Sequence, residues 1–196
     1  MRRLCVYCGS STGDRPEYVT AAKRVGELLV RRGIGLVYGG GSVGLMGVVA
    51  DAVLAGAGEA IGVIPTGLRS RELAHTGVTQ MIEVESMHAR KQRMVDLSDA
   101  FIALPGGIGT LDELFETWTW LQLGIHRKPI GLLDVAGYYG PLIGFLGRMR
   151  DERFIKPAHL DCLLVDTEAE RLVDRLAAFR PPDEGKWIKR EPGLEA

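Results

Sequence analysis

Three glycine-rich segments occur where apolar, strand-like runs end, and each could bind a phosphate group. The segments are Cys8-Gly9-Ser10-Ser11, Gly39-Gly40-Gly41-Ser42-Val43-Gly44 and Pro105-Gly106-Gly107-Ile108-Gly109-Thr110. Glycine lets backbone N–H groups approach an anion closely, and the start of a following helix adds positive potential. A single turn of this kind is common, but three at the same edge of one sheet predict a phosphorylated small molecule as the ligand.

The second segment also matches the G-x-G-x-x-G pattern of dinucleotide-binding proteins, at Gly39, Gly41 and Gly44. That pattern is completed by an acidic residue about 20 positions later, at the end of the next strand. Glu59 lies at this distance but precedes its expected strand. The sequence therefore disfavours NAD, and it lacks the G-x-x-x-x-G-K-[ST] motif of P-loop nucleotidases.

The third segment leads into Glu113, whose carboxylate has two interpretations. Thr110 and Glu113 have the T-x-x-E spacing of a capping box, which would satisfy the first N–H groups of a helix beginning there. In the other interpretation Glu113 belongs to a ligand or catalytic site. The spacing alone favours neither.

Arg90 and Lys91 fall in the first turns of an expected helix over residues 86–97. Cations are unfavourable at this end of a helix because the helix dipole is positive there. A run of charges is often only a solvated helix face, but this placement favours an anionic ligand that compensates both charges.

Cys5 and Cys8 form a C-x-x-C pattern inside an expected strand. Positions three apart in a strand point to opposite faces of the sheet, so the two thiols should diverge. A structural zinc site needs more ligands at close spacing, and the histidines and Cys162 are scattered along the chain. We therefore expect buried, unreactive thiols and no metal site.

The elements that position these residues alternate along the chain. Strands are expected at residues 4–8, 34–38, 60–64, 79–84, 100–104, 129–133 and 160–165, and helices at 16–32, 44–55, 86–97, 110–123, 138–150 and 168–179. This alternation of strands and helices predicts an α/β fold: a Rossmann-like, doubly wound, mostly parallel sheet of about seven strands with helices on both faces. Such sheets bind ligands beyond the carboxyl ends of their strands, and the loop 65–78 is expected to form a lip there.

Length and composition are consistent with a single domain over residues 1–180, followed by a loosely ordered tail over 181–196. The formal net charge is −1, which gives no basic field for binding nucleic acid. No apolar run approaches the ~20 residues of a membrane span. We expect a cytoplasmic protein that binds neither nucleic acid nor membrane.

Taken together, the motifs resemble those of the LOG family, the cytokinin-activating phosphoribohydrolases, whose members have often been mislabelled as lysine decarboxylases. The resemblance is carried by Met87-His88-Ala89-Arg90-Lys91, by residues 105–113, and by residues 8–11, 38–47 and 120–129. It extends, in the right order, to about residue 165, and the upstream M-H-x-R-K with PGG-x-GT-x-x-E is a highly specific combination.

This resemblance implies hydrolysis of the N-glycosidic bond of N6-modified adenosine 5′-monophosphates, and of AMP, to free base and ribose 5-phosphate. It implies a homodimer and no metal or organic cofactor. By the same resemblance Arg90 and Glu113 are the catalytic pair. The substrate-binding residues it implies are Glu72, Arg90, Lys91, Gly106, Gly107, Ile108, Gly109, Thr110, Leu111, Asp112, Glu113 and Thr119. The family often has Glu in place of Asp112, so the Asp112 carboxylate is given no role of its own.

Three alternatives remain at this point. A non-catalytic carrier of a nucleotide or other phosphorylated ligand could use the same glycine turns, but it would not need Arg90 and Glu113. A broader nucleotide 5′-monophosphate nucleosidase would share both the fold and the third turn. A pyridoxal phosphate decarboxylase is disfavoured, because the chain is too short to include the domain that such a cofactor demands.

Overall fold

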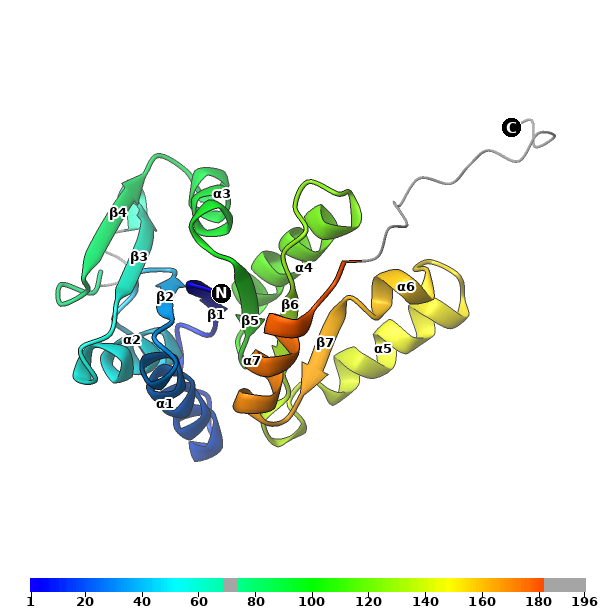
Figure 1. Ribbon diagram of the computed structural model, residues 1–196, viewed down its shortest axis with the longest axis horizontal. Helices are drawn as coiled ribbons and strands as arrows, with labels where there is room; N and C mark the ends of the chain where they lie inside the picture. The colour runs from blue at the N-terminus through cyan, green and yellow to red at the C-terminus, as the bar shows by residue number, and fades with distance from the viewer. Residues whose placement is uncertain (69–73, 182–196) are drawn as a thin grey trace.

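Seven strands, all parallel, form one sheet in the computed structural model of the protein, which describes residues 1–68 and 74–181 (Figure 1). The strands are β1 (Arg3–Tyr7), β2 (Gly35–Tyr38), β3 (Ala60–Pro65), β4 (Gln80–Val84), β5 (Ala100–Ala103), β6 (Ile130–Leu133) and β7 (Leu163–Asp166). Their order across the sheet is β4-β3-β2-β1-β5-β6-β7. The predicted α/β class and doubly wound sheet are confirmed.

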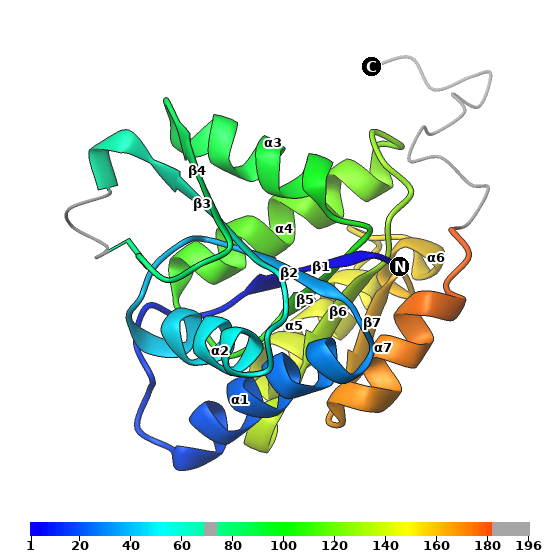
Figure 2. The same ribbon diagram turned by 60° about the vertical axis from the view of Figure 1, so that its left-hand side comes forward.

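Helices cover both faces of the sheet (Figure 2). They are α1 (Pro16–Arg31), α2 (Gly44–Ala55), α3 (Met87–Leu97), α4 (Ile108–Gln122), α5 (Gly140–Asp151), α6 (Pro157–Leu160) and α7 (Ala169–Ala178), with the short 3-10 helices η1 (Thr66–Leu68) and η2 (Val135–Gly137). Helices α1, α2 and α7 contribute to one apolar core, and α3, α4 and α5 contribute to the other. None of the described helices has the length and apolarity needed to cross a membrane.

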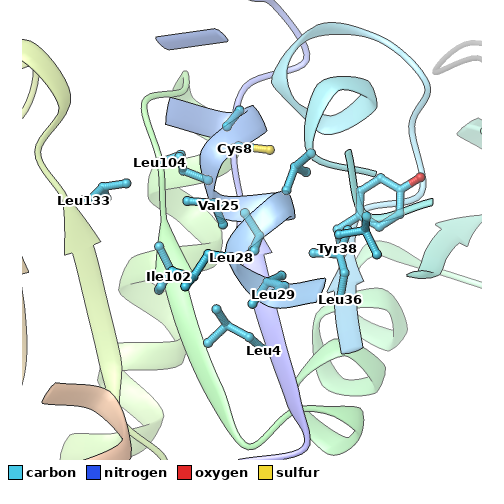
Figure 3. Packing of buried hydrophobic residues seen from close by; sticks show 14 of the residues in the cluster. Leu4, Cys8, Val25, Leu28, Leu29, Leu36, Tyr38, Ile102, Leu104 and Leu133 are labelled. Carbon is cyan, nitrogen blue, oxygen red and sulfur yellow. The ribbon is translucent and has the colours of Figure 1, made fainter. Parts of the chain in front are cut away.

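The side chains of α1 illustrate how the first core forms. Val25, Leu28 and Leu29 recur at the spacing of one helix face, and they are fully or almost fully buried. Figure 3 shows them lying over the central strands that carry Leu4 and Ile102. Strands covered in this way on both faces contain hardly any polar residues, which explains their apolar runs.

The two cysteines of the C-x-x-C pattern separate as predicted. Cys8 joins the core under α1, whereas Cys5 joins the core on the opposite face of the sheet. Both thiols are free and buried, and burial raises the pKa of each. Because the thiolate is the reactive form, neither cysteine is poised for redox chemistry. Among the described residues no group of histidine, cysteine or carboxylate side chains could hold a metal ion.

Three element boundaries differ from the prediction by two residues or more, and one of them is the start of helix α5, which lies at Gly140 rather than at residue 138. The last strand begins at Leu163 rather than at residue 160, because Pro157 starts the short helix α6 in front of it. Helix α4 begins at Ile108, two residues before the predicted start. Part of the expected lip, residues 69–73, and most of the expected tail, residues 182–196, lie outside the described residues.

The strand order reverses between β1 and β5, and this reversal creates the position of the site. From β1 the chain proceeds through β2 and β3 to β4 on one side, and from β5 through β6 to β7 on the other. Helix α1 leaves β1 toward one face and α4 leaves β5 toward the other. The loops after β1 and β5 therefore diverge, and a crevice opens at the carboxyl edge between them.

Candidate functional site

A cavity of about 220 Å³ occupies this crevice. It draws residues from the loops after β1, β2 and β5 and from helices α2, α3 and α4. Its lining consists of Val6, Cys8, Gly9, Ser10, Gly39, Met46, Arg90, Gly107, Ile108, Gly109, Thr110 and Glu113. The first and third glycine turns, Arg90 and Glu113 thus meet in one place.

The start of α4 opens directly into this cavity. Gly107 is the N-cap residue, with extended backbone and no side chain that caps the helix. Gly107, Ile108 and Gly109 are exposed, and a Cβ added at either glycine would meet no atom within 4 Å. The first N–H groups of α4 and its positive dipole end therefore form a site suited to an anion.

Three consecutive carbonyl groups hold the turn in front of α4. The Leu104 carbonyl accepts a hydrogen bond of 2.6 Å from the Tyr139 hydroxyl. The Pro105 carbonyl accepts one of 3.1 Å from the Gly9 N–H, and the Gly106 carbonyl accepts one of 2.6 Å from the Tyr138 hydroxyl. Because every carbonyl in this stretch has a donor, the turn is fixed while the N–H groups of the helix start remain directed at the cavity.

The capping-box interpretation of Glu113 is wrong, because α4 starts earlier than the spacing suggested. Thr110 is the third residue of the helix, and it packs where a Cβ on Gly106 would clash with its hydroxyl. Glu113 is the sixth residue, too far along the helix to pair with the N-cap. The structure places its half-buried side chain on the cavity wall instead.

Arg90 is the most deeply buried charged group at the site, with 4% of its surface exposed. Its Nε donates to the Val63 carbonyl at 3.1 Å and its Nη2 to the Gly39 carbonyl at 2.8 Å. A Cβ on Gly39 would clash with Nη2, so the guanidinium can keep this position only if residue 39 is glycine. A buried guanidinium is costly without such hydrogen bonds, and these two direct it from α3 toward the cavity.

Cys8 also lines the cavity, but its thiol is unsuited to act as a nucleophile. Burial, followed by the negative charge of nearby Glu113, raises the pKa of the Cys8 thiol far above its ordinary value. The thiol is consequently neutral, and Cys8 contributes an apolar wall beside the carboxylate.

Lys91, the other cation of the predicted pair, does not line the cavity. Its Nζ lies 3.1 Å from Oδ2 of Asp112 and 2.9 Å from Oε2 of Glu116, both on α4. Burial alone would lower the pKa of Lys91, but hydrogen bonds with Glu116 and Asp112 outweigh it and the net shift is upward. Lys91 therefore remains charged and joins α3 to α4.

The remaining predicted substrate contacts are distributed differently. Leu111 packs against the core, and Asp112 faces Lys91 rather than the cavity. Thr119 is exposed, about 16 Å along the axis of α4 from Ile108 at 1.5 Å per residue. Glu72 lies outside the described residues. Within the described chain, the structure brings Arg90, Glu113 and the open helix start together, and it leaves Lys91, Asp112 and Thr119 outside the cavity.

The second glycine segment supports the first one and closes the dinucleotide alternative. The Leu45 N–H at the start of α2 donates to the Gly9 carbonyl at 3.0 Å, so one of the first N–H groups of this helix is bonded to the first glycine segment. Gly44 has a φ of +60°, and a Cβ there would overlap the backbone of Ser10. Glu59 pairs with Arg3 at 2.8 Å, at the opposite edge of the sheet from the cavity.

Sequence reasoning missed the apolar wall formed by Val6 and Met46. Both belong to runs that read as ordinary core, and nothing in their spacing separates them from their neighbours. Tyr138 and Tyr139 were missed for a related reason, since an aromatic pair in a loop carries no signal of the carbonyls that it binds.

A larger cavity, of about 860 Å³, lies between α1 and the segments that follow β6 and β7. It contains neither Arg90 nor Glu113, and on its rim the exposed side chains of Arg31 and Glu170 pair with each other at 2.8 Å. The smaller cavity has the groups that can do chemistry, so size does not identify the site here.

The chain is similar to known proteins over most of its length. The profile of a family described as possible lysine decarboxylase matches residues 46–176. A cytokinin riboside 5′-monophosphate phosphoribohydrolase of Arabidopsis thaliana is 49% identical over 194 residues, which cover 99% of this chain and 91% of the relative. A second from the same plant is 50% identical over 180 residues, covering 92% and 83%. The chain belongs to the LOG family.

Solved structures of other proteins share the LOG fold at low identity. The molybdenum cofactor carrier protein of Chlamydomonas reinhardtii has a TM-score of 0.69 and 19% identity, covering 91% of this chain and 99% of the carrier. A molybdenum cofactor binding protein of Rippkaea orientalis has a TM-score of 0.67 and 20% identity, covering 90% and 96%. At these identities the likeness concerns the fold, and the function must be argued from the site.

The support that the second glycine segment gives to this LOG site can be tested by replacing Gly44 with alanine. A left-handed backbone costs a non-glycine residue about 1–2 kcal/mol, and the overlap with Ser10 adds about 1–3 kcal/mol more. Gly124→Ala is the matched control, because Gly124 has a φ of +73° but open space around its Cα. Urea unfolding should show a clearly larger loss of stability for Gly44→Ala, and equal losses would contradict the close packing of the two turns.

Proposed function

We propose that the cavity between β1 and β5 hydrolyses the N-glycosidic bond of N6-modified adenosine 5′-monophosphates, and of AMP, to free base and ribose 5-phosphate. The observation that carries this proposal is the presence of Arg90 and Glu113 on the wall of one cavity into which the start of α4 opens. Membership of the LOG family supports it, since the relatives at about 50% identity are named for this reaction.

The 5′-phosphate binds at the start of α4 in this proposal. The N–H groups of Ile108, Gly109 and Thr110 supply hydrogen bonds, and the helix dipole adds favourable potential. Arg90 supplies fixed positive charge on the neighbouring wall, through a planar guanidinium that can hold a phosphate or the ribose. Phosphate binding at one end of the substrate orients the ribose toward Glu113.

Hydrolysis breaks the bond between ribose C1′ and the base nitrogen. The electron pair leaves with the base, positive charge develops on the sugar ring, and the oxygen of water bonds to C1′. The base takes up a proton as it leaves. Glu113 can stabilise the developing cation, accept hydrogen bonds from ribose hydroxyls or orient the water, and each of these roles depends on its negative charge.

The alternatives lack comparable support from the residues. A carrier of a phosphorylated ligand has no use for a carboxylate beside a buried arginine, although it could share the fold. A lysine decarboxylase that uses an aldehyde cofactor needs an amine to form a Schiff base, and among the described residues no lysine lines the cavity. A broader nucleosidase differs only in the base accepted, so a panel of nucleotides separates it from the proposed activity.

The dependence on phosphate is the first test of the proposed function. N6-isopentenyl-adenosine monophosphate should be hydrolysed, while its nucleoside should react at least 100-fold more slowly, because remote binding energy supports the chemical step. Chromatographic detection of the released base gives both rates, with AMP and the diphosphate as further members of the panel. Equal rates on nucleoside and monophosphate would refute phosphate binding at the start of α4.

Glu113→Gln tests the chemical role of the carboxylate. The amide keeps the size of the side chain but removes its charge, so turnover should fall by roughly 10²–10³, or about 3–4 kcal/mol of transition-state stabilisation. The melting temperature and the binding of ribose 5-phosphate should change little. Glu27→Gln, on the exposed surface of α1, is the control. A Glu113→Gln protein that retains most of its turnover would contradict a chemical role for the Glu113 carboxylate.

The proposal extends to a cytoplasmic homodimer. Trp118 and Leu121 of α4 are buried in the core of their own chain, but beyond them Leu123 is 38% and Ile125 62% exposed. Adjacent exposed apolar side chains favour burial against a second copy. Light scattering at micromolar concentration should give twice the mass of the chain, and the mass of a single chain would contradict the dimer.

The cytoplasmic location rests on the cysteines. Their free thiols suit a reducing compartment, and cell fractionation checks this location.

A further inference from the structure

Two neighbouring residues of α3 face different parts of the molecule. Arg90 points into the cavity, whereas Lys91 is 7% exposed and directs its ammonium group to α4. The two helices lie on the same face of the sheet (Figure 2). Lys91 therefore connects the helix that carries Arg90 to the helix that carries Glu113.

The partners of Lys91 on α4 are arranged around the catalytic carboxylate. Asp112 and Glu116 are four residues apart and thus lie on one side of the helix. Glu113 follows Asp112 directly and is turned about 100° from it, toward the cavity. The bridge is consequently one residue away from Arg90 on α3 and one residue away from Glu113 on α4.

The bridge joins one buried cation to two carboxylates. A single ammonium group lies within 3.1 Å of two carboxylates, and its side chain is 9% exposed. Charge-assisted hydrogen bonds of this kind are short and directional. The Glu116 side chain is 24% exposed and that of Asp112 is 53% exposed, so the Lys91 ammonium group is the part of the bridge that depends on its partners. Two carboxylates on α4 hold the Lys91 ammonium group on the side away from the cavity lining, so the geometry gives Lys91 little freedom to reach a ligand.

We propose that Lys91 is a positioning residue, and that its bridge to Asp112 and Glu116 fixes the distance between Arg90 and Glu113 across the cavity. This inference rests on the proposed function, because it concerns the pair that performs the reaction. It assigns Lys91 a different role from the direct contact with substrate that the family resemblance implies. Displacement of a reacting group by about 1 Å can cost 10²-fold in rate, so a bridge of this kind affects catalysis without touching the substrate.

Glu116→Gln separates the two roles most clearly, because Glu116 lies outside the cavity and Asp112 still holds Lys91 when the charge of Glu116 is gone. If the bridge positions the pair, kcat should fall roughly 10-fold while KM stays within about twofold. If Lys91 instead binds substrate, freeing it from Glu116 should leave kcat unchanged or lower KM. Asp96→Asn, which alters an exposed pair with Gln92 on the same helix, is the control and should match the wild type.

Lys91 variants complete the experiment. Lys91→Met should lower kcat roughly 10- to 100-fold with little change in KM, and Lys91→Arg should restore most of it, because arginine can again bridge two carboxylates. Combining Lys91→Met with Glu116→Gln should cost no more than Lys91→Met alone, since both act through one bridge. Thermal melting identifies any variant that does not fold, and in that event the folded Glu116→Gln protein decides the question.

The outcomes distinguish a failure of the proposed function from a failure of the positioning role of Lys91. A wild-type protein that does not hydrolyse the monophosphate overturns the proposed function, and the positioning role fails with it. An active wild type whose Glu116→Gln variant keeps its kcat, or whose Lys91→Met variant mainly raises KM, overturns the positioning role alone.

Discussion

The burial of one guanidinium group constrains much of this molecule. The Arg90 guanidinium can be buried because the carbonyl groups of Val63 and Gly39 accept its N–H groups. That arrangement leaves no room for a Cβ at position 39, and it brings α3 close to Val63 of β3 and to Gly39 after β2. Lys91 joins α3 to α4, and the cavity lies beside these contacts.

The three glycine segments have different structural roles. The third presents the open start of α4 to the ligand, and the first secures it through the Gly9 N–H. The second holds the first, because the start of α2 binds the Gly9 carbonyl and Gly44 packs against Ser10. A motif that looks like a nucleotide fingerprint thus acts as a support, which shows why a glycine pattern has to be interpreted together with what its N–H groups bind.

The sequence predicted the architecture and most of the cavity, and the reasons for its failures are physical. Apolar runs and turn residues located the strands, and the parallel order placed the turns after β1 and β5 at one edge. The spacing could not show that α4 begins at Ile108, because the N-cap Gly107 uses backbone geometry rather than a capping side chain. It also could not separate Arg90 from Lys91, since adjacent helical residues differ in direction by about 100°, and only the packing of α3 decides which one faces the cavity.

The central claim is that the open start of α4 holds the phosphate while Arg90 and Glu113 act on the ribose. A crystal structure of the Glu113→Gln protein with bound AMP tests this arrangement directly. The account predicts the phosphate on the N–H groups of Ile108 and Gly109, with ribose C1′ next to residue 113 and Arg90 on the adjoining wall. A phosphate seated in the larger cavity beside α1, or a ribose turned away from residue 113, would contradict it.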